Sequence, residues 1–216
     1  MRRPLDLSLY LVTDDGTVAG AALGSLVAAA ITGGVTCVQV RDKSASTRRF
    51  LERVREVQAV ARPLGVPVLV NDRVDVALAA EADGVHLGQA DLPAEPARRL
   101  LGAERILGVT VGDPGAARRA AAEGADYLGS TAVFRTATKA DAGPPIGLAG
   151  LVAIVRAVRL PVVGIGGIDR SNAAAVFETG AAGIAVVSAI CGAADPRRAA
   201  AELAEIARAA HPEFRP

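Results

Sequence analysis

The sequence predicts an α/β fold, namely a single (β/α)8 barrel, or TIM barrel, over residues 1–216. Short runs rich in β-branched residues alternate with Ala-rich helical stretches, which is the pattern of parallel βαβ units. Eight such repeats in 216 residues match a compact barrel, because these barrels start at roughly 200 residues. Neither a shift in composition nor a linker divides the chain, so we expect one domain.

Eight β-branched runs are the predicted strands. In chain order they cover residues 8–13, 37–41, 67–70, 84–87, 106–111, 127–133, 161–165 and 183–188. We expect a helix after each strand. Residues 46–62 carry Phe50, Val54 and Val57 at helical spacing, and the segment 113–123 opens with Asp and Pro, which suit a helix start. A doubly wound open sheet is the competing architecture, but it usually has one main phosphate turn, whereas polar clusters end almost every strand here.

The composition argues against several classes of protein. Hydrophobic residues make up 51% of the chain, which is too many for a disordered protein. The 24 Lys and Arg residues nearly balance the 23 Asp and Glu residues, and aromatic residues make up only 3%, which is unlike a nucleic-acid-binding surface. The apolar stretch 20–35 is interrupted by polar residues and glycines, so it is interpreted as a buried helix and not as a membrane span.

The N-terminus and the cysteines give no sign of secretion or of metal binding. Only a few apolar residues follow Arg2 and Arg3 before Asp6, which is too little for a secretory signal. A cytoplasmic protein is therefore expected. Cys37 and Cys191 lie far apart in the sequence without a neighbouring Cys or His, so they are interpreted as small buried hydrophobic residues.

The second predicted strand ends in polar residues that alternate with valines. Period-2 alternation places Gln39, Arg41 and Lys43 on one face, and Val38 and Val40 on the other. We expect the valines to face the helices and the polar residues to point towards the mouth of the barrel. Because burial of two cations without a partner is costly, an anionic ligand is one explanation of this pattern. Salt bridges to neighbouring acids are the alternative.

Carboxylates follow the third and fourth predicted strands. Asp72 comes directly after Asn71, and Asp91 follows the strand that contains His86. Two carboxylates at adjacent strand ends, opposite a cationic cluster, could hold Mg2+, which commonly uses one or two carboxylates together with phosphate oxygens. The alternative for each carboxylate is a helix N-cap. His86 is interpreted as a hydrogen-bonded structural residue.

Three further loops carry residues that suit anions. The loop after the sixth strand contains Thr136, Thr138 and Lys139, and such loops often close over a bound substrate. The seventh strand ends in a glycine pair that includes Gly167, and the eighth ends at Ser188. These last two loops of a barrel frequently bind phosphate, although close packing also selects glycine. The sequence therefore predicts a mouth that binds two anionic groups.

Lysine is rare in this chain. Of the 24 basic residues only Lys43 and Lys139 are lysines, and the others are arginines. Because the chain uses arginine everywhere else, we predict that these two positions need a compact ammonium group.

Six motifs occur along the chain in a fixed order. They are Tyr10-Leu11-Val12-Thr13-Asp14, Gln39-Val40-Arg41-Asp42-Lys43, Asn71-Asp72-Arg73, Gly84-Val85-His86-Leu87-Gly88-Gln89 with Asp91, Thr136-Ala137-Thr138-Lys139 and Ile165-Gly166-Gly167-Ile168. This set resembles the thiamine-phosphate synthase family over nearly the whole chain. The resemblance implies a Mg2+-dependent transferase on a (β/α)8 barrel. Such an enzyme couples 4-amino-2-methyl-5-hydroxymethylpyrimidine diphosphate to 4-methyl-5-(2-phosphoethyl)thiazole and releases diphosphate.

The resemblance also implies a role for each matching residue. Gln39 would contact the pyrimidine, and Asp72 and Asp91 would hold Mg2+. The residues expected at the diphosphate are Arg41, Lys43, Asn71, Lys139 and Thr110, the last of which stands where the family often has serine. The residues expected at the thiazole phosphate are Thr136, Thr138, Gly167, Val187 and Ser188.

The residue types fit this chemistry. If the diphosphate leaves before the thiazole nitrogen attacks, the protein mainly has to stabilise a departing polyanion and align the nucleophile. No activated side-chain nucleophile is needed, and the motifs contain none. The expected partners are the two small-molecule substrates, without nucleic acid or membrane, and the sequence leaves a homo-oligomer open.

Some residues depart from the family pattern, and other functions compete with the main hypothesis. Ser130 and Thr131 stand in a turn that is richer in glycine in the family, and Arg135 stands where proline is frequent. Gly112 and Asp113 occupy the place where related thiazole tautomerases have His, which argues against a tautomerase. A non-catalytic regulator that binds thiazole phosphate is the second hypothesis, but it would have little use for metal carboxylates. A sugar-phosphate epimerase would need different acid and base residues.

Overall fold

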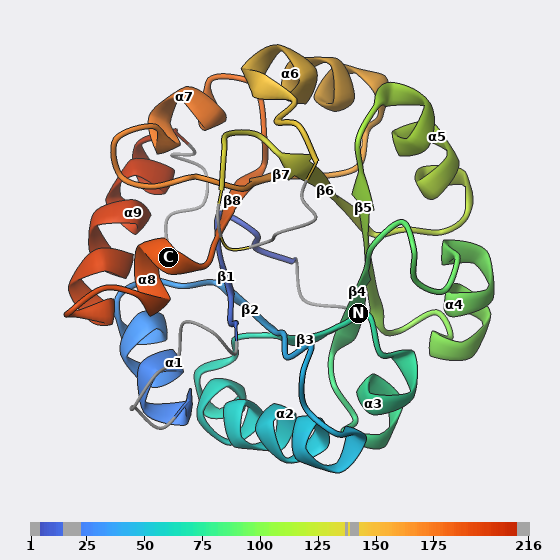
Figure 1. Ribbon diagram of the computed structural model, residues 1–216, viewed down its shortest axis with the longest axis vertical. Coiled ribbons are helices and arrows are strands. Elements are labelled where there is room, and N and C mark those ends of the chain that lie inside the picture. The colour runs from blue at the N-terminus through green and yellow to red at the C-terminus, as the bar shows by residue number, and fades with distance from the viewer. Residues whose placement is uncertain (1–4, 15–22, 137, 139–142, 211–216) are drawn as a thin grey trace.

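Eight parallel strands form a closed barrel (Figure 1). The computed structural model describes residues 5–14, 23–136, 138 and 143–210. The strands are β1 (Leu9–Val12), β2 (Cys37–Val40), β3 (Val68–Asn71), β4 (Gly84–Leu87), β5 (Ile106–Val111), β6 (Tyr127–Ala132), β7 (Val162–Ile165) and β8 (Gly183–Val186). They pair in chain order, and β8 pairs with β1 to close the sheet. The predicted (β/α)8 barrel is confirmed.

The helices form a ring around the strands (Figure 1). In the described part of the chain they are α1 (Leu23–Thr32), α2 (Thr47–Ala61), the 3-10 turn η1 (Arg62–Leu64), α3 (Val74–Ala79), α4 (Ala94–Leu101), α5 (Pro114–Ala122), α6 (Gly147–Ala157), α7 (Ala173–Phe177), α8 (Ser188–Cys191) and α9 (Pro196–Ala210). A helix follows each strand, as predicted, and both α8 and α9 follow β8.

The predicted strand bounds differ little from those in the structure. The fourth and fifth strands have the predicted bounds, and five others differ by one residue at one or both ends. The eighth is two residues shorter than predicted, because Ser188 already begins α8. The apolar pattern therefore locates the strands well, and it fails only where a short helix continues the apolar run.

Polar side chains cap the first turns of two helices, one of them at the helix start predicted at Asp113. The side chain of Ser46 caps α2 by accepting a hydrogen bond from the N–H of Arg49 at 3.3 Å. Phe50 lies on the buried face of this helix. Asp113 caps α5 by accepting from the N–H of Ala116 at 2.9 Å. These caps satisfy N–H groups that the first turn of a helix leaves unpaired.

The barrel has two apolar layers, one on each face of its sheet. Between strands and helices lies a large cluster that includes Val38 and Val40 of β2, as predicted. The interior cluster is smaller, and its buried residues are Leu7, Tyr10, Val12, Cys37, Leu69, Tyr127, Val163 and Ala185. Cys37 and Cys191 are both free thiols and buried, as predicted. Residues two positions beyond an interior side chain share its face, so Gln39 follows Cys37 into the barrel.

The helices were also compared with the length and apolar character that a bilayer span requires. None of those in the described part of the chain meets that requirement.

Candidate active site

The residues predicted to bind substrate gather at the carboxyl ends of the strands, the end of a (β/α)8 barrel at which active sites are built. Gln39 is the third residue of β2, Asn71 ends β3, and Thr110 is the last residue but one of β5. The other described candidates follow a strand; they are Arg41, Lys43, Asp72, Asp91, Thr136, Thr138, Gly167, Val187 and Ser188. Lys139 lies outside the described residues.

The cations that follow β2 both have acidic partners. Gln39 itself is buried, whereas the guanidinium of Arg41 pairs with Asp14 and the ammonium of Lys43 pairs with Asp72. The Lys43 side chain is 55% exposed. The alternative explanation of the pattern, salt bridges to neighbouring acids, is therefore present in the structure for both cations.

Asp72 turns the chain at the end of β3. Its φ of 62° lies in the left-handed region, which Asp tolerates better than most residues do. Its N–H donates to the carbonyl of His86 at 2.8 Å. Helix α3 has Arg73 as its N-cap and no side-chain cap bond. The helix-cap alternative for Asp72 is therefore wrong, and the Asp72 carboxylate accepts from Lys43 instead.

Asp91 lies in the turn that follows β4. Its Oδ2 accepts a hydrogen bond from the N–H of Gly88 at 2.7 Å. The helix-cap alternative is wrong here too, because α4 starts at Ala94 and has Pro93 as its N-cap. The carboxyl group of Asp91 is also hydrogen-bonded to that of Asp72. Two acids from adjacent strand ends therefore meet at the mouth.

The two carboxyl groups titrate as a pair. Burial raises the pKa of Asp91, and the hydrogen bond with Asp72 raises it further, against the effect of the Gly88 N–H. Burial also opposes ionisation of Asp72, but hydrogen bonds with Asp91 and Lys43 outweigh it and lower the pKa of Asp72. The pair thus retains a proton more readily than two separate carboxylates would.

The pair fits a Mg2+ ion with few protein ligands. Within the part of the chain that the structure describes, no third His, Cys, Asp or Glu joins Asp72 and Asp91 in a metal-binding cluster. Mg2+ keeps several waters and is often bound by one or two carboxylates together with phosphate oxygens of a substrate. This donor set, with Lys43 beside it, suits a metal whose coordination a phosphorylated ligand completes.

A chain of hydrogen bonds crosses the barrel interior. The Nε2 of Gln39 donates to the hydroxyl of Tyr10 at 2.7 Å, and that hydroxyl lies 2.9 Å from the hydroxyl of Tyr127. The Tyr127 hydroxyl is 2.8 Å from Nδ1 of His86, whose Nε2 is 2.9 Å from Oγ1 of Thr110. His86 is thus hydrogen-bonded, as predicted. The chain connects two candidate site residues, Gln39 and Thr110.

Sequence reasoning assigned no role to the two tyrosines of this chain. Tyr10 and Tyr127 are the only tyrosines in the protein, and both are buried. The rarity of tyrosine in this sequence is the signal that could have pointed to these two residues. A second signal lies in the neighbouring strand, because a Cβ at Gly108 would lie 2.2 Å from the Tyr127 ring. Glycine at that position makes room for the ring.

The loops that follow β6 and β7 pack closely together. Gly167 has a φ of 65°, and a Cβ there would lie 2.4 Å from the carbonyl oxygen of Arg135. Backbone packing therefore requires glycine at this position, whether or not a phosphate binds there. In the β6 loop the N–H of Thr138 donates to Oγ1 of Thr136 at 3.2 Å, so both hydroxyl residues belong to one turn.

The remaining candidates and the residues that depart from the family pattern lie around β6 to β8. Val187 is the N-cap of α8, and Ser188, the first residue of that helix, is exposed. The hydroxyl of Ser130 accepts the N–H of Ile165 at 3.3 Å, where the register between β6 and β7 shifts. Serine at this position thus supplies a hydrogen bond that the sheet irregularity leaves unmade. Arg135 is exposed.

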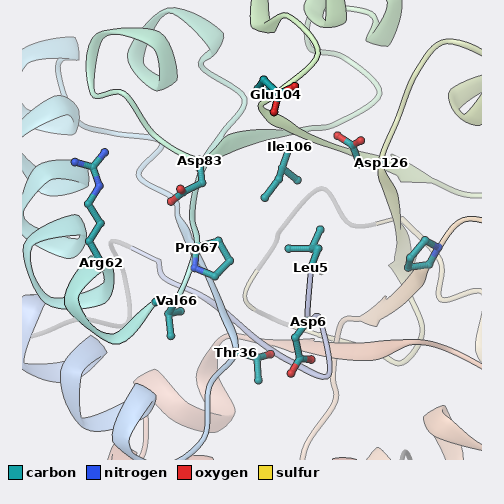
Figure 2. Close-up of a pocket in the computed structure, with 12 residues that line it drawn as sticks. Leu5, Asp6, Thr36, Arg62, Val66, Pro67, Asp83, Glu104, Ile106 and Asp126 are labelled. Carbon is teal, nitrogen blue, oxygen red and sulfur yellow. The ribbon is translucent and has the colours of Figure 1, made fainter. Parts of the chain in front are cut away.

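A cavity of about 580 Å³ lies at the opposite, amino end of the barrel (Figure 2). Several residues that line it stand directly before a strand, among them Asp83 and Asp126. Asp83 accepts the N–H of Val68 at 2.8 Å, and Asp126 accepts the N–H of Leu107 at 2.7 Å. None of the candidate residues that the structure describes lines this cavity, so it is separate from the site that they form.

Comparison with known proteins identifies the family. The family model described as thiamine monophosphate synthase matches residues 9–190, which include all eight strands. The chain belongs to the thiamine monophosphate synthase family. The family resemblance of its motifs is thereby confirmed.

Relatives of the thiamine monophosphate synthase family cover almost the whole chain. The thiamine-phosphate synthase of Moorella thermoacetica is 50% identical over 198 residues, which is 92% of this chain and 94% of that protein. The thiamine-phosphate synthase of Chloroflexus aurantiacus is 51% identical over 199 residues, which is 92% of each. The solved structure of thiamine phosphate pyrophosphorylase from Pyrococcus furiosus is 41% identical, with a TM-score of 0.87, and the match covers 96% of this chain and 98% of that one.

Proposed function

We propose that this protein is a transferase that makes thiamine phosphate. It would couple 4-amino-2-methyl-5-hydroxymethylpyrimidine diphosphate to 4-methyl-5-(2-phosphoethyl)thiazole and release diphosphate. Relatives that are half identical and carry the name thiamine-phosphate synthase support the proposal. The structural observation that carries it is the pair of carboxyl groups, Asp72 and Asp91, beside Lys43 at the carboxyl end of the barrel. A cytoplasmic location and a homo-oligomer stay predictions.

The pyrimidine diphosphate would bind along β2 to β5. Gln39 is buried inside the barrel, where an amide can pair with the donors and acceptors of a pyrimidine ring. Arg41, Lys43 and Asn71 stand at the mouth above it, where they can bind diphosphate oxygens. Thr110 approaches the same region from β5. To bind a diphosphate, both cations would share or exchange the carboxylates that they contact in the structure, Asp14 and Asp72.

The thiazole phosphate would bind beside the loops after β6, β7 and β8. The residues proposed for this subsite are Thr136, Thr138, Gly167, Val187 and Ser188. Hydroxyls and backbone N–H groups at these strand ends suit a phosphate, and in (β/α)8 barrels the loops after the seventh and eighth strands frequently form such sites. Lys139 would act from the β6 loop on the diphosphate of the other substrate.

The reaction breaks one bond and forms another. The bond between the pyrimidine methylene carbon and the diphosphate oxygen breaks, and its electron pair leaves with the diphosphate. The lone pair of the thiazole nitrogen then forms the new carbon–nitrogen bond. The departing charge would be stabilised by Arg41, Lys43 and Lys139, and it would accept a hydrogen bond from Thr110. The protein would also hold the two reactants in line. No side chain has to act as a nucleophile.

We propose Asp72 and Asp91 as the protein ligands of Mg2+. When bound, the metal would supply positive charge that offsets the charge of the leaving diphosphate. Both carboxyl groups would have to be deprotonated to act as ligands, and the raised pKa of Asp91 opposes this at acid pH. Lys43 would stay near Asp72 and add its charge to the same group of oxygens.

Diphosphate release tests the proposal. The purified protein is mixed with both substrates and Mg2+, and diphosphate and thiamine phosphate are measured. Formation of both products, dependent on both substrates, is expected. Tight binding of the thiazole phosphate without diphosphate release would favour a regulator that kept only one of the two anion sites. Conversion of the thiazole substrate alone would favour a tautomerase.

A further inference from the structure

The hydrogen-bonded chain from Gln39 to Thr110 has a defined direction. An amide nitrogen can only donate, so the Tyr10 hydroxyl accepts from Gln39. The Tyr10 hydrogen then has Tyr127 as its acceptor, since the hydroxyl of Tyr127 is its other partner. The hydrogen of Tyr127 is then left for Nδ1 of His86, 2.8 Å away, which accepts it when the imidazole has its proton on Nε2. One fixed donor at the start of the chain therefore sets each bond that follows.

The hydrogen-bonded series ends at Thr110, near the mouth of the barrel. With Nδ1 as an acceptor, a neutral His86 carries its proton on Nε2 and donates to Oγ1 of Thr110. Thr110 then accepts from inside the barrel, and its own hydrogen remains available to a ligand. If His86 held its proton on Nδ1 instead, Thr110 would donate inward to Nε2, and only its oxygen lone pairs would be left for a ligand. An anion needs the first arrangement, because phosphate oxygens accept hydrogen bonds.

We propose that Tyr10, Tyr127 and His86 are positioning residues that hold the Thr110 hydroxyl as a hydrogen-bond donor towards the diphosphate and fix the amide of Gln39 against the pyrimidine. The inference deepens the proposed function and rests on it. The chain joins the contacts to the two ends of one substrate, the pyrimidine ring at Gln39 and the diphosphate at Thr110. The three residues act through Gln39 and Thr110.

The hydrogen-bonded series places polar side chains in the barrel interior, where apolar residues would have a smaller desolvation cost. Burial of hydroxyl groups costs free energy that their hydrogen bonds must offset, and branched aliphatic residues usually fill the interior of such barrels. Here the two rings meet edge to face, with centroids 6.0 Å apart and planes at 72°. Glycines make room on neighbouring strands. A Cβ at Gly108 would lie 2.2 Å from the Tyr127 ring, and one at Gly129 would lie 3.0 Å from His86.

A double-mutant cycle separates positioning from a general effect on the fold. Tyr127→Phe and Thr110→Val should each lower kcat/KM for the pyrimidine diphosphate by about tenfold, while KM for the thiazole phosphate stays unchanged. The double variant should lose clearly less than the hundredfold product of the two single losses, because without the Thr110 hydroxyl Tyr127 can act only through Gln39. Thr110→Ser keeps the hydroxyl. When Tyr127→Phe is combined with Thr110→Ser, it should therefore lower kcat/KM as much as it does in the wild-type protein. A double variant that loses about a hundredfold would overturn the proposal.

The tautomer of His86 can be observed without activity. The chain has only two histidines, His86 and His211, so 15N NMR of protein labelled in histidine gives few resonances to assign. In the wild-type protein, at a pH where the imidazole is uncharged, we expect a protonated Nε2 and an unprotonated Nδ1. Gln39→Glu puts an acceptor at the start of the chain, so it should shift the proton of His86 to Nδ1. A wild-type His86 with its proton on Nδ1, or with both nitrogens protonated, would overturn the proposal even if the variants fail to fold.

Thr36→Val is the matched control for a lost hydroxyl. Thr36 exchanges hydrogen bonds with the backbone of Leu9, the first residue of β1, and its hydroxyl is not part of the hydrogen-bonded series from Gln39 to Thr110. Its loss should lower the melting temperature but leave kcat/KM and the His86 tautomer unchanged. An inactive wild-type protein whose His86 has the expected tautomer would count against the proposed function alone. An active wild-type protein with the opposite tautomer would overturn this inference alone.

Discussion

The two ends of the barrel both carry aspartates next to strands, yet these aspartates have different partners. At the amino end, Asp83 stands before β4 and Asp126 before β6, and each accepts a backbone N–H from the preceding strand. At the carboxyl end, Asp72 and Asp91 follow β3 and β4, and their carboxyl groups meet each other. Backbone N–H groups bind both members of the first pair, and Arg98 adds its charge to Asp126. In the second pair Asp91 accepts the N–H of Gly88 and Asp72 accepts from Lys43, but the two acids also interact with each other.

At the amino end, the side chains that accept backbone hydrogen bonds occur in a regular pattern. Thr36, Asp83 and Asp126 precede the second, fourth and sixth strands, and the side chain of each accepts an N–H at the start of the strand before it. Figure 2 shows the two aspartates around the cavity at this end. Such bonds complete the ladder of parallel strands where it starts. The comparison teaches that the partner of a carboxylate, and not its place beside a strand, distinguishes a structural aspartate from a candidate ligand.

The largest effect is expected at the carboxyl end. Asp72→Asn and Asp91→Asn should each lower kcat/KM by about a hundredfold or more, because a metal contributes several kcal/mol of charge stabilisation. Asn keeps the size of the side chain and tolerates the positive φ of residue 72. The melting temperature should change little. Steady-state diphosphate release at several Mg2+ concentrations measures the effect. Wild-type turnover in both variants would remove the metal assignment.

The amino end should give the opposite result. Asp126→Ala removes the acceptor for the N–H of Leu107 at 2.7 Å and for a guanidinium nitrogen of Arg98 at 2.6 Å. We expect a loss of about 1–3 kcal/mol in the free energy of unfolding, which corresponds to roughly 2–4 °C of melting temperature per kcal/mol for a domain of this size. The kcat/KM of the folded protein should equal that of the wild type. A large kinetic defect with unchanged stability would erase the contrast between the two ends.

Much of this comparison could be predicted from the sequence. The alternation of strands and helices fixes a closed parallel barrel, and parallel strands bring their carboxyl ends together, so the approach of Asp72 to Asp91 followed from the fold. The partners of the cations did not follow. Whether Arg41 meets Asp14 depends on side-chain rotamers at the mouth, which the pattern of a strand does not specify.

The hydrogen-bonded chain inside the barrel was also beyond sequence reasoning. It depends on contacts between β1, β2, β4, β5 and β6, which include strands that are not neighbours in the sheet. Such contacts arise from the curvature of the closed barrel and the space left by Gly108. Likewise, the glycine at position 167 has a packing reason that only the adjacent loop reveals.

Exchange of lysine and arginine sharpens the comparison further. At the amino end, Arg98 uses its planar fork fully, because it donates to Asp126 and to the carbonyls of Gly102, Arg105 and Gly124. At the carboxyl end, Lys43 presents a compact ammonium to Asp72. Arg98→Lys should therefore lower stability without a kinetic defect.

Replacement of lysine by arginine at the carboxyl end should instead produce a kinetic defect. Lys43→Arg and Lys139→Arg should each lower kcat/KM by at least about tenfold, or roughly 1.4 kcal/mol, because a wide guanidinium does not replace a point charge at a crowded diphosphate site. Steady-state kinetics measure this loss. Arg119→Lys, on the exposed face of α5, is the control and should behave as the wild type. Near-wild-type rates in both lysine variants would mean that the two lysines of this chain were retained by chance.

The smallest expected effect is a dependence of the Mg2+ requirement on pH. The raised pKa of Asp91 means that the pair holds a proton to higher pH than a separate aspartate would, whereas the lowered pKa of Asp72 keeps that group ionised. A metal must displace the proton on Asp91. As pH falls through the raised pKa, more Mg2+ should therefore be needed for half-maximal diphosphate release, and the requirement should level off at higher pH.

The variant Asp91→Asn isolates this effect, because Asn cannot take up the proton. Its Mg2+ requirement should be higher than that of the wild type at every pH, but it should lack the pH dependence that comes from residue 91. The diphosphate of the substrate also titrates, and it does so equally for both proteins. The ratio of the two Mg2+ requirements, followed as pH falls through the raised pKa of Asp91, thus reports Asp91 alone, with a limit of about tenfold per pH unit for a single proton. The ratio should shrink towards acid pH, where the wild type loses its advantage. A constant ratio would show that metal binding does not displace a proton from the pair, and the two ends of the barrel would then differ in hydrogen bonding but not in titration.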